Sequence, residues 1–189
     1  MQLLKILINL LRQIASRKLK ILIIIIIFSP NFAHSFKSGA EYALLIEYET
    51  NQVLYEKNSR KKIYPASMSK LMTLYILFDY LDKNIISLDE KIFISENAWR
   101  KGGAVSDSST MFAEVSSYIS IENIIKGIVI QSGNDACIAI AEAISGSEEI
   151  FSDEMNSYAK KLGMNDSNFV NSTGLHDDNH YSTPLDMTI

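Results

Sequence analysis

Cysteine is nearly missing from this 189-residue chain, which contains Cys137 and no other. A single cysteine excludes an intramolecular disulfide, so the fold has to depend on a packed core. Cys137 lies within the apolar series 136–141, which favours a small buried side chain over a nucleophilic thiol. Internal repeats and low-complexity segments are missing after residue 35, which indicates one ordinary globular domain.

Acidic residues are missing from the first 35 positions, which hold five basic residues. An apolar run at 21–28 follows the basic positions, and the small-residue site Ala33-His34-Ser35 follows that run. This order predicts a secretory signal peptide over 1–35. The uninterrupted apolar run is too short to cross about 30 Å of hydrocarbon, although the apolar stretch at 3–11 leaves an uncleaved N-terminal anchor open. We therefore expect an exported, periplasmic protein, tethered to the inner membrane if the leader is kept.

The segment 36–189 is long enough to form one domain with its own core. Of the 18 basic and 22 acidic residues, only five basic ones lie in the leader, so this segment carries 13 basic and 22 acidic side chains and a net charge of −9. An acidic surface argues against nucleic acid or anionic lipid as the partner.

The first part of this segment has strand patterns followed by one long apolar helix. We predict strands at 42–48 and 53–56, joined by a tight hairpin in which Asn51 takes a positive φ. Residues 67–82 predict a helix that is apolar on nearly all sides, and therefore a buried helix at the centre of the domain.

The second part is mainly helical and has recognisable helix ends. A short strand is expected at 89–95 and a polar loop at 102–110. Serine caps, acidic first turns and terminal glycine predict the helices that follow, and Thr183 with Pro184 predicts another helix start. The expected helices are 121–130, 134–144 and 147–162.

Ser67-Met68-Ser69-Lys70 places a hydroxyl and an amine three residues apart at the start of the apolar helix. Positions i and i+3 share a helical face, so a neutral Lys70 is placed to take the Ser67 proton and activate a nucleophile. The apolar surroundings should lower the pKa of Lys70, and the Ser67 N–H in the first turn should be unpaired. The alternative is that Ser67 is a helix cap and Lys70 a solvated side chain, because such pairs are common by chance.

Ser132-Gly133-Asn134 lies at the junction of two predicted helices, where Gly133 permits a sharp turn. Ser132 is a candidate proton relay, and the Asn134 amide is a candidate for binding a substrate carbonyl and positioning Lys70. A glycine C-cap followed by an asparagine N-cap explains the same residues without chemistry.

The two motifs together resemble those of the serine D-Ala-D-Ala carboxypeptidases, the low-molecular-mass penicillin-binding proteins. The similarity extends around both motifs and includes segments further along the chain. These segments are 65–73, 127–136, 161–164, 171–175 and 180–183. The resemblance implies a mixed α/β transpeptidase fold of the β-lactamase and penicillin-binding-protein type.

The resemblance also implies the chemistry of peptidoglycan biosynthesis and cell-shape control. Ser67 would form an acyl-ester with a stem peptide ending in D-Ala-D-Ala, Lys70 would be the general base, and Ser132 and Asn134 would assist. No metal or organic cofactor is implied, and β-lactams would acylate the same serine. A class A β-lactamase shares S-x-x-K but usually has S-D-N as its second motif, so it is the weaker alternative.

Lys-Thr-Gly, the third motif of the resembled family, does not occur in the sequence. In relatives the strand that carries this motif follows a helix like the one predicted to start at Thr183, so we expect an incomplete catalytic domain. It would hold the helical part and the first two sheet strands, without the C-terminal strands. The alternatives are an inactive fragment, a split enzyme with a complementing C-terminal chain, and a non-catalytic peptidoglycan-binding module.

Overall fold

The structure of the chain is a computed structural model that describes residues 12–13 and 36–189. The chain divides into two units, Met1–Lys37 and Ser38–Ile189, and the helices and strands named below lie in the second. The predicted signal peptide lies outside the described residues. Within the described part, no helix combines the length and hydropathy that a membrane span requires.

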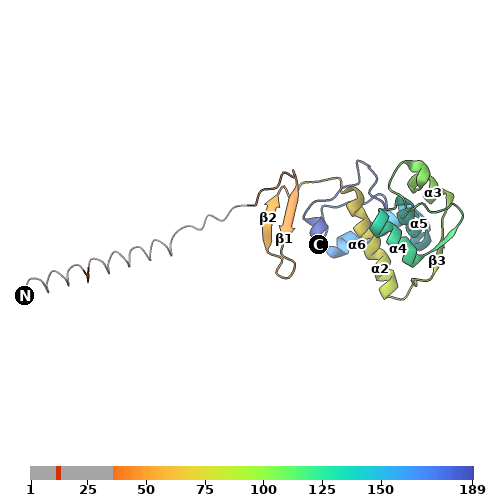
Figure 1. Cartoon of the computed structure of the whole chain (residues 1–189), viewed down its shortest axis with the longest axis horizontal. Coiled ribbons are helices and arrows are strands. Elements are labelled where there is room, and N and C mark those ends of the chain that lie inside the picture. Colours follow the sequence, from red (N-terminus) through yellow and green to blue (C-terminus); the bar gives the residue numbers. More distant parts are fainter. Residues whose placement is uncertain (1–11, 14–35) are drawn as a thin grey trace, which may run out of the picture. The chain divides into compact units, whose positions relative to one another are not determined.

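Helices dominate the second unit; the β1–β2 hairpin precedes them, and β3 and β4 come between helices in the chain (Figure 1). The order of elements is β1 (Ala43–Ile46), β2 (Val53–Lys57), η1 (Ala66–Ser69), α2 (Lys70–Asp82), β3 (Lys91–Phe93), α3 (Glu96–Gly102), η2 (Ala104–Ser106), β4 (Tyr118–Ser120), α4 (Ile121–Gln131), α5 (Asn134–Ser145), α6 (Glu148–Leu162) and η3 (Asp186–Thr188).

The strands of residues 36–189 form two small antiparallel sheets. β1 pairs with β2 through a hairpin in which Asn51 has φ +56°, as the sequence predicted. β3 pairs with β4 in the register Ile92 opposite Ile119. β4 was not predicted, because three residues directly before a helix are too few to show an alternating pattern.

The ends of α6 follow the capping signals of the sequence, whereas Ser120 before α4 makes no side-chain cap hydrogen bond. The Ser147 hydroxyl accepts from the backbone N–H of Ile150 at 3.2 Å, and Gly163 ends α6 with φ +89°. Glu148 and Glu149 in the first turn and Lys160 and Lys161 in the last turn complement the helix dipole. The Thr183 hydroxyl accepts from the Asp186 N–H at 3.0 Å, although a 3-10 turn and not an α-helix follows.

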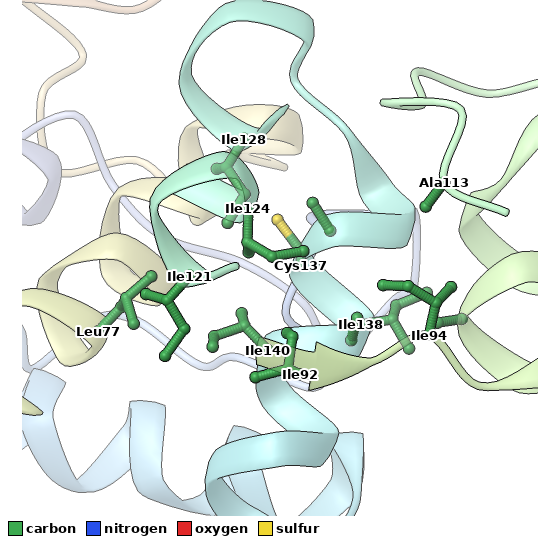
Figure 2. Packing of buried hydrophobic residues seen from close by; sticks show 13 residues of the cluster. Leu77, Ile92, Ile94, Ala113, Ile121, Ile124, Ile128, Cys137, Ile138 and Ile140 are labelled. Carbon is green, nitrogen blue, oxygen red and sulfur yellow. The ribbon is translucent and has the colours of Figure 1, made fainter. Parts of the chain in front are cut away.

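The main core surrounds α5 (Figure 2). Every side chain from Ala136 to Ala141 is buried, and α5 packs against α2, α3, α4 and α6. Ile121, Ile124 and Ile128 project from α4 onto Cys137 and its neighbours. Each fully buried isoleucine adds roughly 1.5–3 kcal/mol to the stability of the fold, so the start of α5 is held firmly in place.

The prediction that α2 is the buried central helix was wrong. α5 occupies that place, while α2 buries Met72, Ile76 and Leu77 and leaves Leu71, Tyr75 and Phe78 about half exposed. An all-round apolar sequence shows that a helix is suited to burial on every side. It does not show which sides are covered within a given chain.

Candidate active site

Ser67 and Lys70 meet at the junction of η1 and α2. Pro65 precedes the turn, Ser67 lies in η1, and Lys70 is the first residue of α2. The three-residue spacing brings Lys70 Nζ to 3.0 Å from Ser67 Oγ. Ser67 is exposed while Lys70 is buried, so the hydroxyl faces solvent and the amine lies beneath it.

The turn that presents Ser67 has a strained backbone. Ala66 has φ +48°, a left-handed conformation that is uncommon for any residue other than glycine. Met68 N–H donates to Pro65 O at 3.1 Å, so the first paired amide of this turn is that of Met68. The Ser67 N–H precedes it and has no backbone acceptor within residues 36–189, as predicted for a group that donates to an oxyanion.

Lys70 is the buried cation of the site, with 4% of its surface exposed. Burial lowers the pKa of Lys70 below its ordinary value, because the charged form loses hydration. This is the direction that the apolar surroundings predicted. Cys137 lies near this lysine and is fully buried, and burial raises the pKa of its thiol to about 12. The expectation that Cys137 is buried is confirmed.

Ser132 reaches the same lysine from the turn between α4 and α5. Lys70 Nζ lies 3.1 Å from Ser132 Oγ, so one amine contacts both serine hydroxyls. Ser132 itself takes the left-handed conformation, with φ +54°. The expectation that Gly133 makes the sharp turn was therefore wrong. Gly133 is extended, and it is needed because a Cβ there would lie 2.9 Å from Met111 N.

Asn134 is the first residue of α5, and its side chain is 5% exposed. Its amide nitrogen Nδ2 donates to Ser108 Oγ at 3.1 Å. Its amide oxygen Oδ1 is buried and has no hydrogen-bond partner within the described residues. The structure thus brings Asn134 to the site beside Ser132, and the polar partners of Lys70 are the hydroxyls of Ser67 and Ser132.

Asp135 organises the loop beside the site and was not singled out by sequence. Its buried carboxylate accepts from Thr110 Oγ1 at 2.7 Å and from the backbone N–H groups of Met111, Ala113 and Ala136 at 2.9, 3.1 and 3.0 Å. An aspartate in the first turn of a helix is ordinary, so the sequence does not reveal that it holds residues 110–113.

His180 supports the nucleophile turn from behind. Val170 N–H donates to His180 Nδ1 at 3.2 Å, which leaves the proton of the neutral ring on Nε2, and Nε2 donates to Ser69 Oγ at 2.7 Å. Burial lowers the pKa of His180 and so favours this neutral form. Ser182 pairs with Ile63 through two backbone hydrogen bonds. These bonds attach the segment that carries His180 to the chain just before the nucleophile turn.

Gly174 also contacts the turn and was missed as a contact residue. Its φ is +80°, and a Cβ at this position would lie 1.8 Å from Ala66 O. The sequence places Gly174 in a segment similar to the resembled family, but a glycine alone does not identify the backbone that lies against it.

An exposed serine that shares a hydrogen bond with a buried lysine is the arrangement of the Ser–Lys acyl-transfer enzymes, because the neutral amine can take the serine proton. Comparison with known proteins makes the class specific. Residues 30–189 match the family model described as D-alanyl-D-alanine carboxypeptidase. The chain belongs to this family.

Curated relatives carry the same family name. The chain is 44% identical over 161 residues to the D-alanyl-D-alanine carboxypeptidase DacF of Bacillus subtilis, covering 85% of this chain and 39% of DacF. It is 40% identical over 147 residues to DacC of Escherichia coli, covering 77% of this chain and 37% of DacC. The chain therefore spans about two fifths of the length of these relatives.

Solved structures confirm the fold. The crystal structure of the D-alanyl-D-alanine carboxypeptidase DacD from Francisella tularensis matches with a TM-score of 0.76 and 37% identity, covering 81% of this chain and 36% of that one. Penicillin-binding protein 5 from Haemophilus influenzae matches with a TM-score of 0.77 and 34% identity, covering 80% and 44%. The fold is the mixed α/β transpeptidase fold that the resemblance implied, and its two small sheets are part of that domain.

Proposed function

We propose that this chain carries the acylation centre of a serine D-Ala-D-Ala carboxypeptidase that acts on peptidoglycan stem peptides. The observation that supports this most directly is the position of Lys70 Nζ, 3.0 Å from Ser67 Oγ and 3.1 Å from Ser132 Oγ. Burial lowers the pKa of the lysine and so increases the fraction of neutral amine near neutral pH.

In the proposed acylation step, Lys70 removes the proton of Ser67 as Oγ attacks the carbonyl carbon between the two terminal D-alanines. The carbonyl oxygen becomes an oxyanion, to which the Ser67 N–H is free to donate. The carbon–nitrogen bond then breaks, and the departing D-alanine nitrogen receives the proton from Lys70 through Ser132. An ester on Ser67 remains.

Water completes the proposed cycle. Neutral Lys70 takes a proton from the water, whose oxygen attacks the ester carbon, and the ester bond to Ser67 Oγ breaks. The shortened peptide leaves with a new carboxyl group, and Ser67 regains its proton. Asn134 is proposed to hold the substrate and to help position Lys70.

β-Lactams are proposed to acylate Ser67 in the same way. Penicillin-Binding Protein D2 from Listeria monocytogenes, solved in an ampicillin-bound form, matches this chain with a TM-score of 0.67 and 30% identity, covering 84% of this chain and 61% of that one. A strained cyclic amide is attacked as a peptide is, but the leaving nitrogen stays attached. The resulting ester is a stable label for the site.

Export to the periplasm is the location that suits this substrate. The basic and apolar order of residues 1–35, followed by a small-residue site, supports secretion, and the acidic balance of 36–189 suits an enzyme that does not bind anionic lipid. We propose cleavage after Ser35, with inner-membrane tethering as the outcome if the leader is kept.

The exposed apolar side of α2 supports the proposal that a further segment of the catalytic domain packs against it. Leu71, Tyr75 and Phe78 are 58%, 47% and 50% exposed. A groove of about 190 Å³ beside them is lined by Met72 and Leu162, among others. Because the curated relatives are more than twice as long, we infer that the active enzyme covers this side with such a segment, in the same polypeptide or in a complementing chain.

Labelling with a fluorescent penicillin tests the proposed function. The full chain should become covalently labelled, and Ser67→Ala should abolish the label while Ser109→Ala, an exposed serine in the neighbouring loop, keeps it. Release of D-alanine from a stem pentapeptide should require Ser67 as well. Absence of label from soluble, folded protein contradicts the acylation centre. Retained binding to peptidoglycan without D-alanine release would favour a binding module.

A further inference from the structure

A short series of hydrogen bonds connects the end of α3 to Asn134. It starts at the carbonyl of Gly103, which accepts from Ser106 N at 3.0 Å and from Ser106 Oγ at 2.7 Å. A carbonyl oxygen only accepts, and both of its lone pairs are used here. The single hydroxyl proton of Ser106 is therefore committed to Gly103.

The direction of the remaining bonds follows from that commitment. Ser106 Oγ and Ser108 Oγ lie 2.7 Å apart, and only Ser108 still has a proton to place between them. Ser108 Oγ then has only lone pairs left for Asn134, so the Asn134 atom that lies 3.1 Å away must be a hydrogen-bond donor. Nδ2 is the donor end of the amide. The buried oxygen Oδ1 points elsewhere and has no partner within the described residues.

Both ends of this series are fixed to the start of α5. A Cβ on Gly102 would lie 2.3 Å from Asp135 N, which shows how closely the end of α3 packs on α5. These two helices lie side by side (Figure 1). Asn134 N–H donates to Ser109 O at 2.8 Å, and Asp107 takes φ +52° in the turn between the two serines. The hydroxyls are thus held by packed backbone.

We propose that Ser106 and Ser108 are positioning residues that fix the orientation of the Asn134 amide. They hold Nδ2 on Ser108 and keep Oδ1 available as an acceptor for an N–H donor in the acylation centre. The expected effect on catalysis rests on the proposed function. The orientation of the amide follows from the hydrogen-bond directions alone.

The sharpest test compares the effect of one mutation on stability in two backgrounds and does not need activity. Ser106→Ala in the otherwise unchanged chain removes a bond and should lower the denaturant midpoint of unfolding. In Asn134→Asp, a carboxylate that can only accept faces the lone pairs of Ser108. Ser106→Ala then frees the Ser108 proton to donate to it without competition from Ser106, so the same mutation should lower the midpoint less than in the unchanged chain, or raise it. Ser109→Ala is the matched control and should not depend on residue 134.

A midpoint that falls equally in both backgrounds would overturn the proposed orientation. The catalytic consequence is measured separately as the rate of labelling by fluorescent penicillin. Ser106→Ala and Ser108→Ala should each slow labelling about two- to tenfold, as expected for a net hydrogen bond. Neither should slow it further when Asn134 is alanine. Persistence of both effects in Asn134→Ala would contradict the proposed route through Asn134. If the unchanged chain is not labelled, the proposed function fails and the unfolding test still decides the orientation.

Discussion

Gly174→Ala should disturb the nucleophile turn without touching Ser67 or Lys70. The added Cβ would lie 1.8 Å from Ala66 O, whereas real Cβ contacts are essentially never shorter than 3.0 Å. The two backbones must therefore separate by at least 1.2 Å, the difference between those two distances. Ala66 directly precedes Ser67 and already has a strained φ of +48°, so the displacement should reach the nucleophile.

The expected cost has two parts. An alanine at φ +80° costs about 1–2 kcal/mol in backbone strain. The forced separation adds about 1–3 kcal/mol, the range for overpacked sites. A misplacement of about 1 Å in an acylation centre should slow acylation on the order of 10²-fold.

Gly146→Ala is the matched control. Gly146 has φ +83° and no atom within 4 Å of an added Cβ, so it shares the backbone strain and lacks the collision. Its unfolding free energy should fall by about 1–2 kcal/mol with acylation unchanged. Chemical denaturation and the rate of labelling by fluorescent penicillin measure both quantities. If Gly174→Ala matches Gly146→Ala in both, the contact with Ala66 does not position the nucleophile.

Three further predictions concern the buried polar groups. The rate of acylation should rise with pH as Lys70 loses its proton, and the midpoint of this pH–rate profile should lie below the ordinary lysine pKa of about 10.4. A midpoint at or above that value would contradict the effect of burial on Lys70. Burial keeps the folded pKa of His180 below the unfolded value of about 6.5, so its contribution to stability is present above that pH and declines as pH falls below it. His180→Gln should remove this decline from the pH dependence of unfolding, whereas the exposed His176→Gln should leave it. Asp135→Asn should lower the unfolding free energy by about 2–5 kcal/mol, because the new NH₂ group faces the hydrogen-bond donors that the carboxylate accepts from. A loss below about 1 kcal/mol in chemical denaturation would show that Asp135 is not what holds residues 110–113.

The helical part of the fold could be predicted because its signals are local. α6 shows this best, because its ends follow from the Ser147 cap, the terminal charges and Gly163, which act within one turn. α4 and α5 lie close to their predicted bounds, although Ser120 and Gly133 before them make no side-chain cap hydrogen bond. α3 was not predicted: no element was expected at 96–101, and Gly102 and Gly103 suggested that a polar loop begins at 102. Gly102 instead closes the helix, and its missing Cβ lets α3 approach Asp135 N. Such a packing reason has no sequence signal.

The sequence predicted which side chains meet at the candidate site and did not predict what supports them. The spacing of Ser67 and Lys70, together with the motif that contains Ser132, identified the side chains that share hydrogen bonds, whereas the side chain of Asn134 bonds Ser108 instead. The left-handed backbone at Ser132 was not foreseen, since the adjacent Gly133 is the residue that usually takes it. Contacts across the fold, such as Ser69 with His180, join residues 111 positions apart, and no local pattern encodes them.

Peptide mapping by mass spectrometry after incubation with benzylpenicillin shows directly which residue is acylated. We expect one penicilloyl adduct on the peptide that contains Ser67. The full chain should form it, and both Ser67→Ala and Lys70→Met should lose it. Lys70→Met should at the same time keep or raise the unfolding midpoint, because it removes a buried cation. A folded chain that stays unmodified, or that carries the adduct on another residue, would contradict the assignment of Ser67 and Lys70 as the acylation centre.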